Sequence, residues 1–437
     1  MGISLKQQRT NSQCTIVVSR PRNGLEWILS RNAKLNTSPI RKRTAKYLAR
    51  RQAALQAASS LLNRKGLKGM TRGEVAVHMG VVEGALSYYF ASKEALAAAC
   101  FHRALEARES LIRDAAQETT PTARVTRLVR GHFERARRVA CGEAEEVAVF
   151  DDLRALGDPG VDAAYVTMFR NARKLLDAGG PAREDRQILN ARTHWLLQQL
   201  IWVDIWLPRY EPDSYARTAE RMIDIMTKGL APPGRAWSPP GLVVPDVADA
   251  DFNGPRETFL VAATQLINLQ GYTGASVEKI AARLGLTKGA FYYHIDAKDD
   301  LVAVCFARSA EVIRRTQLAS ELLKADAGDR LSAALTSLVG HQLQGDIPLL
   351  RAQTVSLPDP IRRTVLQDFE RNAVAFGSTV SDGIADGSIR PVDVQIAAQM
   401  ITSTLNAAAE LYQWIPSPYT ALTARNFVRP LFEGLLA

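Results

Sequence analysis

Short runs of apolar residues at helical spacing occur twice in the chain, each between a hydroxyl-bearing residue and a glycine. In the first run, Val75, Ala76 and Met79 recur every three or four positions, which predicts one apolar face of a helix. Thr71 precedes the run and Gly80 follows it, and these residue types favour the start and the end of a helix. We therefore expect a short helix between Thr71 and Gly80.

The second run repeats this order of residue types. Ser276 takes the capping position at the start of the predicted helix, and Gly285 follows its end. The apolar stripe between them is Ile280, Ala281 and Leu284. After each glycine a tight turn and a second short helix are predicted, over Val82–Phe90 in the first copy and Thr287–Ile295 in the second. Two short helices joined by such a turn are typical of a helix-turn-helix, whose second helix enters the major groove of DNA.

The two copies align without a gap at an offset of 205 residues, with Gly66–Phe101 matched to Gly271–Phe306. Twelve of these 36 positions are identical: Gly66/Gly271, Gly69/Gly274, Ala76/Ala281, Gly80/Gly285, Gly84/Gly289, Ala85/Ala290, Tyr88/Tyr293, Lys93/Lys298, Leu96/Leu301, Ala98/Ala303, Cys100/Cys305 and Phe101/Phe306. We call the two predicted DNA-binding domains, residues 44–104 and 256–309, the first and second readers. Two readers within one chain predict an intramolecular dimer.

Both copies resemble the tetracycline-repressor (TetR) family pattern Gly-[Val/Leu]-x-x-Gly-x-[Leu/Phe]-x-Tyr-[Tyr/His]-[Phe/Ile]-x-x-Lys-x-x-Leu. The second copy, GLTKGAFYYHIDAKDDL, is the better match. The first copy, GVVEGALSYYFASKEAL, carries Val82 where the family usually has Ser or Thr, and Ser87 where it usually has a first Tyr. The resemblance implies an all-α fold of two fused subunits, each with a three-helix DNA-binding domain and a helical bundle for ligand binding and dimerisation. We expect the two subunits to form an intramolecular pseudo-dimer.

The resemblance also implies which residues contact DNA. Phosphate contacts fall to a capping hydroxyl, a tyrosine and a lysine of each copy: Thr71, Tyr88 and Lys93, and Ser276, Tyr293 and Lys298. Such groups are common phosphate ligands, which fix register without reading sequence. Base reading falls to exposed residues of the second helix: Glu83, Ala85 and Ser87, and Thr287, Lys288 and Tyr292. Because Glu favours a cytosine amino group and Lys favours guanine acceptors, we expect an operator with two unlike half-sites.

Charge is concentrated at the N-terminus. The chain of 437 residues has a formal net charge of +10, but residues 1–51 hold twelve Lys or Arg against Glu26 alone, so the remainder sums to −1. This segment is either a basic arm that follows DNA phosphates or a solvated tail. As an arm, its best part is Arg41, Lys42 and Arg43.

These patterns divide the chain into six segments. Residues 1–43 are the basic arm, 44–104 the first DNA-binding domain and 105–230 the first helical regulatory domain. A proline-rich linker covers 231–255, followed by the second DNA-binding domain over 256–309 and the second regulatory domain over 310–437. By resemblance, helices over 187–206 and 213–228 pack against helices over 392–414 and 418–435.

Aromatic residues in the regulatory segments line an effector pocket or belong to the plain core. They are Tyr165, Phe169, Trp195, Trp202, Phe369, Phe376 and Tyr412. Little charge accompanies them, so the expected effector is a small apolar or aromatic compound. The expected function is repression, in which the bound effector moves the two readers away from a separation of one DNA turn, ~34 Å.

Two alternatives stay open: an activator that uses the same DNA contacts, and a sequence-tolerant architectural protein in which only the second helix-turn-helix binds DNA. An enzyme is disfavoured because the six histidines are scattered and no HExxH motif or Gly-rich phosphate loop occurs.

The remaining expectations concern partners and location. The four cysteines form no CxxC pair, so neither a metal nor a cofactor is expected, and they suit small core positions. The N-terminus lacks an apolar signal segment, which predicts a cytoplasmic protein without a membrane partner. The expected partners are double-stranded operator DNA and a small-molecule effector, and pairing of two chains as a further homodimer stays open.

Overall fold

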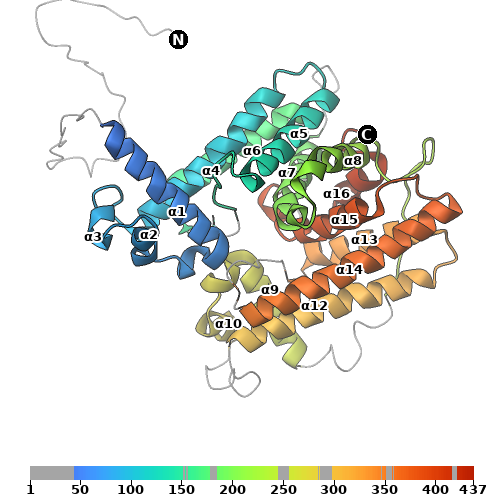
Figure 1. The fold of residues 1–437 in the computed structure, drawn as a ribbon. Coiled ribbons are helices and arrows are strands. Elements are labelled where there is room, and N and C mark those ends of the chain that lie inside the picture. Colours follow the sequence, from blue (N-terminus) through green and yellow to red (C-terminus); the bar gives the residue numbers. More distant parts are fainter. Residues whose placement is uncertain are drawn as a thin grey trace, which may run out of the picture. The chain divides into compact units, whose positions relative to one another are not determined.

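The computed structural model describes residues 44–150, 153, 156–177, 185–244, 255–283, 285, 298–345, 347–350, 357, 359–415 and 421–437. The regular elements in these residues are all helices (Figure 1), so the all-α prediction is confirmed there. None of the described helices combines the length and the apolar character that crossing a bilayer requires. The predicted phosphate ligands Arg41, Lys42 and Arg43 lie outside the described residues.

The first repeat folds into four consecutive helices. They are α1 over Ala45–Gly69, α2 over Arg72–His78, α3 over Glu83–Leu86 and α4 over Lys93–Ala115. Thr71 caps α2 as predicted, because its side chain accepts a hydrogen bond from the backbone N–H of Glu74. Gly80 then turns the chain with a φ of 64°, a left-handed conformation that glycine adopts without a Cβ clash.

The second repeat follows the first residue for residue where it is described. Helix α9 spans Pro255–Gly274, α10 spans Val277–Arg283 and α12 spans Lys298–Glu321. Both ends of α10 and the first residue of α12 stand at the offset of 205 residues from α2 and α4. Gly285 has a φ of 66° and repeats the turn made by Gly80. The sequence repeat is therefore a structural repeat.

Each repeat buries one cysteine against the helix that opens its domain. Cys100 Sγ donates to the carbonyl O of Leu55 at 3.6 Å, and Cys305 Sγ donates to the carbonyl O of Leu260 at 3.9 Å. Burial raises the pKa of both thiols to about 11. Both cysteines are therefore small interior residues.

Because the thiolate is the reactive form, neither buried thiol should react in the folded protein. At mildly alkaline pH we expect iodoacetamide to label the exposed Cys141 and to spare Cys100 and Cys305 until denaturant is added. Peptide mass spectrometry before and after denaturation reads all three sites. Labelling of Cys100 or Cys305 in the native chain as fast as Cys141 would contradict their burial.

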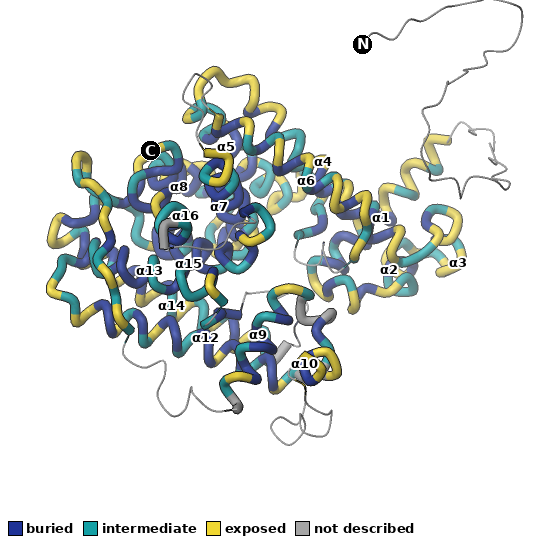
Figure 2. Tube along the Cα trace, turned by 180° about the vertical axis from the view of Figure 1, so that it is seen from behind, coloured by how far each residue is buried: buried dark blue, intermediate teal, exposed yellow. Residues whose placement is uncertain are grey.

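A helical bundle follows each repeat. The first consists of α5 over Pro121–Ala140, α6 over Pro159–Leu176, α7 over Arg186–Trp206 and α8 over Tyr215–Lys228. The second consists of α13 over Ala327–Gln344, α14 over Asp359–Asp386, α15 over Val394–Ala408 and α16 over Ala421–Glu433. Helix α4 packs against α5 and α6, and α12 packs against α13 and α14. Figure 2 shows buried residues concentrated in the bundles, whereas α3 is largely exposed.

The last two helices of one half pack against the last two helices of the other. Contacts join α7 to α15 and α16, and α8 to the same two helices. Polar groups cross this buried contact: Trp195 Nε1 donates to Thr404 Oγ1 at 2.9 Å, and Gln199 Nε2 donates to the carbonyl O of Met400 at 3.0 Å. Side chains of both halves belong to one hydrophobic core.

The C-terminal ends of α8 and α16 meet in a reciprocal contact. The backbone N–H of Leu230 donates to the carbonyl O of Leu431 at 3.0 Å, and the N–H of Leu435 donates to the carbonyl O of Met226 at 2.8 Å. Met226 and Leu431 are matched at the offset of 205 residues, and so are Leu230 and Leu435. The two hydrogen bonds are therefore one contact made in both directions, which is the pattern that a two-fold relation produces.

The proline-rich segment after α8 is fastened to the second half. Trp237 Nε1 donates to Ser332 Oγ at 2.6 Å, and the Trp237 ring stacks on Phe432 with 5.7 Å between centroids. Arg235 pairs with Asp326 at 2.7 Å. Residues 231–244 contain no helix, and residues 245–254 lie outside the described ranges. The first part of this connection therefore packs against α13 and α16.

Candidate nucleic-acid interface and inner cavity

The recognition element of the first repeat is shorter than the sequence predicts. Its α-helical part, α3, has four residues rather than the predicted Val82–Phe90. After it, the backbone N–H of Ser87 bonds to the carbonyl of Gly84, three residues earlier, as in the tight end of a helix. The glycine at position 84 has low helix propensity, which accounts for the short regular part.

The predicted base-reading residues lie on the outer side of α3. Glu83 and Ser87 are exposed and Ala85 is half-buried, whereas Leu86 is fully buried beneath them. Ser87 Oγ accepts a hydrogen bond from Arg72 Nη2 at 2.7 Å. The first repeat thus presents a carboxylate and a hydroxyl at the surface predicted to face the bases.

Arg72 is a candidate that the sequence reasoning missed. It is the first residue of α2, where acidic residues are favoured by the helix dipole. Its guanidinium reaches α3 through Ser87 and also donates to the carbonyl of Ala91 at 3.4 Å. A cation at this unfavourable helix position is the signal that could have identified Arg72 as a further phosphate ligand.

Tyr88 is held at the surface by two neighbouring rings. Its side chain is 69% exposed, and its ring centroid lies 5.5 Å from that of Tyr47 in α1 and 5.2 Å from that of Tyr89. Both pairs have the edge-to-face geometry that aromatic rings prefer. The phenol is therefore positioned before any ligand arrives, and its contact with a DNA phosphate stays a prediction.

Lys93 opens α4 and contacts the end of α1. Its Nζ donates to the carbonyl O of Lys68 at 3.0 Å, and this hydrogen bond is exposed. Ser92 caps the same helix by accepting from the N–H of Ala95. A phosphate contact by Lys93 would exchange this exposed hydrogen bond for a stronger one to an ionised oxygen. That contact also stays a prediction.

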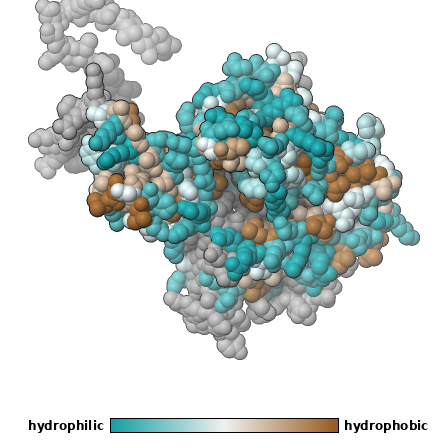
Figure 3. Space-filling view, in the orientation of Figure 1, coloured by the Kyte–Doolittle hydropathy of each residue, from teal (hydrophilic) through white to brown (hydrophobic). Residues whose placement is uncertain are grey.

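Two valines beside α3 are unusually exposed for apolar residues. The exposed fraction is 76% for Val77 and 77% for Val82. Figure 3 shows apolar side chains gathered over α2 and α3. Val82 stands at the start of α3, where its side chain supplies no capping hydrogen bond. Exposed apolar groups mark interaction surfaces, and in the major groove they contact the methyl group of thymine.

Less of the second DNA reader is described. Ser276 caps α10, because its Oγ accepts from the backbone N–H of Lys279 at 3.3 Å. Lys298 opens α12 at the position that matches Lys93. The other predicted contacts of this copy lie outside the described residues: Thr287, Lys288, Tyr292 and Tyr293.

A cavity of about 400 Å³ lies inside the first half. Helices α4 and α5 and the turn after α7 contribute an aliphatic wall that includes Leu111, Val139 and Leu207. The basic and acidic side chains in its lining are Arg108, His132, Arg135, Glu146 and Asp204. This volume is in the range of cavities that bind small molecules, about 300–1,000 Å³.

Asp204 joins two of the ionisable groups of this cavity. Its Oδ1 lies 3.1 Å from His132 Nε2, and its Oδ2 lies 3.7 Å from Arg108 Nη2. Burial raises the pKa of Asp204, but its interactions with His132, Arg108 and Arg135 outweigh burial and the net pKa is lowered. Burial lowers the pKa of His132, which leaves the ring neutral near neutral pH. The carboxylate of Asp204 is therefore ionised and balances Arg108.

The lowered pKa of His132 makes stability depend on pH. Unfolded histidine titrates near about 6.5, whereas folded His132 takes up its proton only at lower pH. As the pH falls through the pKa of unfolded histidine, the unfolded chain binds a proton before the folded chain does, so the folded state loses stability. We expect the thermal unfolding temperature to fall between about pH 7.5 and about pH 5.5, and to fall less in His132→Gln. Equal falls in the two proteins would show that another group is responsible.

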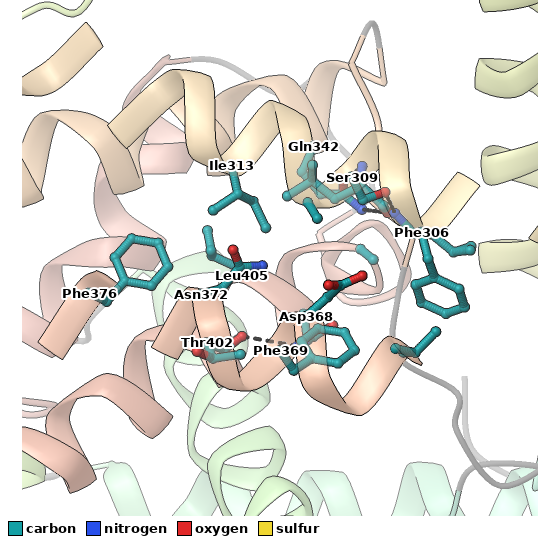
Figure 4. A pocket seen from close by; sticks show the side chains of 16 residues that line it. Phe306, Ser309, Ile313, Gln342, Asp368, Phe369, Asn372, Phe376, Thr402 and Leu405 are labelled. Atoms are coloured by element: carbon teal, nitrogen blue, oxygen red, sulfur yellow. Dashed lines mark hydrogen bonds between the residues drawn. The ribbon is translucent and has the colours of Figure 1, made fainter. Parts of the chain in front are cut away.

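The corresponding cavity of the second half is much smaller. Its volume is about 30 Å³, and Figure 4 shows Ile313 of α12 beside Phe369 and Phe376 of α14 around it. Ile313 follows Arg108 by 205 residues, so an aliphatic side chain stands where the first half has a cation. The two halves therefore differ in both the volume and the charge of this region.

The aromatic residues predicted for an effector pocket lie mostly in the core. Trp195 and Trp202 are buried where the two halves meet, and Phe169 stacks on Trp414 with 3.5 Å between centroids. Phe369 and Phe376 line the small second cavity, Tyr412 lines a separate hollow near α9, and Tyr165 packs against Phe150. All seven are absent from the lining of the 400 Å³ cavity.

A segment after α5, residues 143–150, connects this cavity to the first DNA reader. Asn63 of α1 donates from Nδ2 to the carbonyl O of Val147 at 2.9 Å and accepts from the N–H of Val149 at 2.8 Å. Asn63 and residues 146–150 line the cavity. The second half repeats the first of these bonds, since Asn268 Nδ2, at the offset of 205 residues, donates to the carbonyl O of Leu349 at 2.8 Å. In each half, the matched asparagine therefore joins the DNA-binding domain to its helical bundle by a hydrogen bond.

Comparison with known proteins matches both repeats to one family model. Its description is "Bacterial regulatory proteins, tetR family", and it matches residues 54–100 and 259–305. A curated relative, the HTH-type transcriptional regulator LmrA of Bacillus subtilis, is 28% identical over 134 residues. That alignment covers 29% of this chain and 70% of the relative.

Similar solved structures include two bacterial regulators. The TetR family transcriptional regulator PfmR from Thermus thermophilus is 22% identical, with a TM-score of 0.34, and the match covers 40% of this chain and 98% of that chain. The transcriptional regulator FadR from Bacillus subtilis, solved in complex with stearoyl-CoA, is 21% identical with a TM-score of 0.33 and covers 40% of this chain and 98% of its own. The two domain matches, rather than these scores, carry the assignment.

Proposed function

The chain belongs to the tetR family of bacterial regulatory proteins, with two TetR-type units in tandem, and we propose that it is a single-chain repressor that a small effector releases from its operator. The observation that carries this proposal is the reciprocal contact between the ends of α8 and α16. This contact supports a pairing of the two halves within one polypeptide, like the pairing of two subunits in a dimer.

Covalent linkage changes how such a repressor assembles. The second reader is always present at the effective concentration set by the linker, so pairing of the readers does not depend on the concentration of the protein. The fastened start of the linker, with Trp237 and Arg235 bound to the second half, supports this arrangement. One chain then occupies one operator.

Fusion also lets the two readers diverge, and we propose that the operator has two unlike half-sites. The first reader presents Glu83, with the exposed Val82 beside it, where the second has Lys288 and Thr287. Glutamate accepts from cytosine and lysine donates to guanine, so the same position reads different bases in the two halves. The exposed valine adds a preference for thymine in the first half-site.

Release is proposed to start at the 400 Å³ cavity of the first half. A ligand with a largely apolar body fits its aliphatic wall. Residues 146–150 line the cavity and hold Asn63 of α1, so a shift of this segment reaches the first reader directly. An effector that favours the shifted arrangement lowers the affinity for DNA by its differential affinity for the two states.

A mobility-shift titration on the DNA upstream of the chain's own gene tests this function. The variants are Glu83→Ala with Tyr88→Ala in the first reader, and Thr287→Ala with Lys288→Ala in the second. Arg113→Ala, an exposed change near the C-terminal end of α4, is the matched control. We expect each reader pair to weaken specific binding by about 10-fold to 100-fold, because each lost base contact costs about 1–3 kcal/mol.

The outcomes separate the proposal from its alternatives. Loss of binding in the second-reader pair alone would contradict the single-chain pseudo-dimer and favour one active reader. Binding that competitor DNA removes equally in all variants would favour a sequence-tolerant protein. In a reporter with the same DNA, we expect the chain to lower transcription. Increased transcription would show that the chain is an activator.

A further inference from the structure

One cation of the first-half cavity lacks a carboxylate partner among the described residues. Asp204 pairs with Arg108 and with His132. Glu146 Oε1 accepts a hydrogen bond from the amide Nδ2 of Asn63 at 2.7 Å. Arg135 Nη2 instead donates to the backbone carbonyl O of Glu145 at 3.2 Å, and no described carboxylate lies within 4.0 Å of this guanidinium. Arg135 is thus the cation of this lining that makes no salt bridge with a described carboxylate.

Other guanidinium groups lie near Arg135. Burial lowers its pKa, and Arg108 and Arg103 lower it further, which together outweigh the attraction of Asp204. A neutral ligand that filled the cavity would exclude solvent from Arg135 and leave its charge without a counter-charge in contact, which is costly for a desolvated cation. A ligand with a carboxylate would instead supply a charge-assisted hydrogen bond.

We propose that the first-half cavity binds a small molecule with an apolar body and one carboxylate. Arg135 pairs with this carboxylate, and Arg108 lies beside the pair. The aliphatic wall formed by Leu111, Val139 and Leu207 takes the apolar body. This inference rests on the proposed function only in treating the ligand as an effector, since binding itself requires no DNA. It adds a charge requirement to the apolar effector expected from the sequence.

The second half does not offer an equivalent site. Its matching cavity is about 30 Å³, too small for more than a water molecule, and Ile313 replaces Arg108 there. We therefore expect one ligand of this class per chain.

Arg135 also connects the ligand to the first reader. Its hydrogen bond to the carbonyl of Glu145 holds the 143–150 segment, and the same segment holds Asn63 of α1. A carboxylate that draws the guanidinium toward the cavity competes with the bond to Glu145. Residues 143–150, which bind Asn63 of α1, would then lose their hydrogen bond to Arg135.

Isothermal titration calorimetry of the full chain tests the charge requirement without DNA. The probes are octanoate and naphthoate, each compared with the alcohol of the same carbon skeleton, octanol and naphthalenemethanol. Arg135→Met keeps an unbranched side chain similar to the aliphatic part of arginine and removes the charge. Arg138→Met is the matched control, because Arg138 is on the same helix and outside the lining.

At least one carboxylate is expected to bind one site per chain, about 10-fold or more tighter than its alcohol, as expected for a hydrogen bond to a charged group. Arg135→Met should remove this advantage and leave alcohol binding unchanged, Arg135→Lys should keep most of it, and Arg138→Met should behave as the native chain. Alcohols that bind as tightly as the acids, two sites per chain, an unaffected Arg135→Met variant or a native chain that binds neither acid would each overturn the inference.

Repeating the mobility shift with the binding acid separates this inference from the proposed function. Binding of the acid together with release of DNA supports both. Binding of the acid without any effect on DNA leaves the inference standing and contradicts effector-controlled release.

Discussion

Replacing Gly229 by alanine is expected to destabilise the junction between the two halves by about 2–5 kcal/mol. Gly229 has a φ of 69°, and a Cβ added there would lie 2.0 Å from the carbonyl O of Phe432. Both the left-handed backbone and the collision with a backbone atom oppose a side chain. Gly434 matches Gly229 at the offset of 205 residues, and its added Cβ would lie 2.5 Å from the carbonyl O of Thr227. We expect the same effect from Gly434→Ala.

Gly142→Ala is the matched control for this prediction. Gly142 has a φ of 72°, but an added Cβ would meet no atom within 4 Å, so the control carries only the backbone cost, about 1–2 kcal/mol. Thermal unfolding and hydrogen exchange of α8 and α16 are the measurements. If Gly229→Ala and Gly142→Ala gave the same unfolding temperature, the close reciprocal contact would not contribute to stability.

The second large effect is expected from Glu257→Ala in α9. Arg308 is 3% exposed, and its Nε donates to Glu257 Oε1 at 2.7 Å while its Nη1 donates to the carbonyl O of Pro348 at 2.7 Å. Removing the carboxylate leaves a buried guanidinium without its counter-charge, which costs about 3–5 kcal/mol. We expect faster hydrogen exchange in α9 and α12, and weaker DNA binding by the second reader.

The repeat supplies the control for this change as well. Gln52 occupies the position that matches Glu257, and its amide bonds to Glu145, as does Arg103, the match of Arg308. Because Gln52 is exposed and neutral, Gln52→Ala should cost less than about 1 kcal/mol. An equal cost at the two positions would mean that the buried ion pair of the second half has no special role.

Local sequence signals predicted the DNA-reading domains well. Thr71 and Ser276 cap helices where expected, and Gly80 and Gly285 make the same left-handed turn. These features depend on the chemistry of a few adjacent residues, so one sequence suffices to find them. The length of α3 was predicted less well, because Gly84 and the change to three-residue hydrogen bonding shorten the helix.

The inner cavity was not predictable in the same way. Arg108, His132 and Asp204 stand on three different helices, and no spacing in the sequence relates them. Helical periodicity indicates which face is buried but not what that face meets. Trp195 and Trp202 illustrate this limit, since their buried face meets the other half of the chain instead of a ligand.

The mass of the protein–DNA complex tests the central claim most directly. The full chain is mixed with its operator and the complex is measured by size-exclusion chromatography with light scattering, alongside the second-reader variant Thr287→Ala with Lys288→Ala. We expect one chain of 47.9 kDa on each operator for the native protein, and specific binding about 10-fold to 100-fold weaker in the variant. Two native chains on each operator would contradict the claim that a single chain supplies both readers.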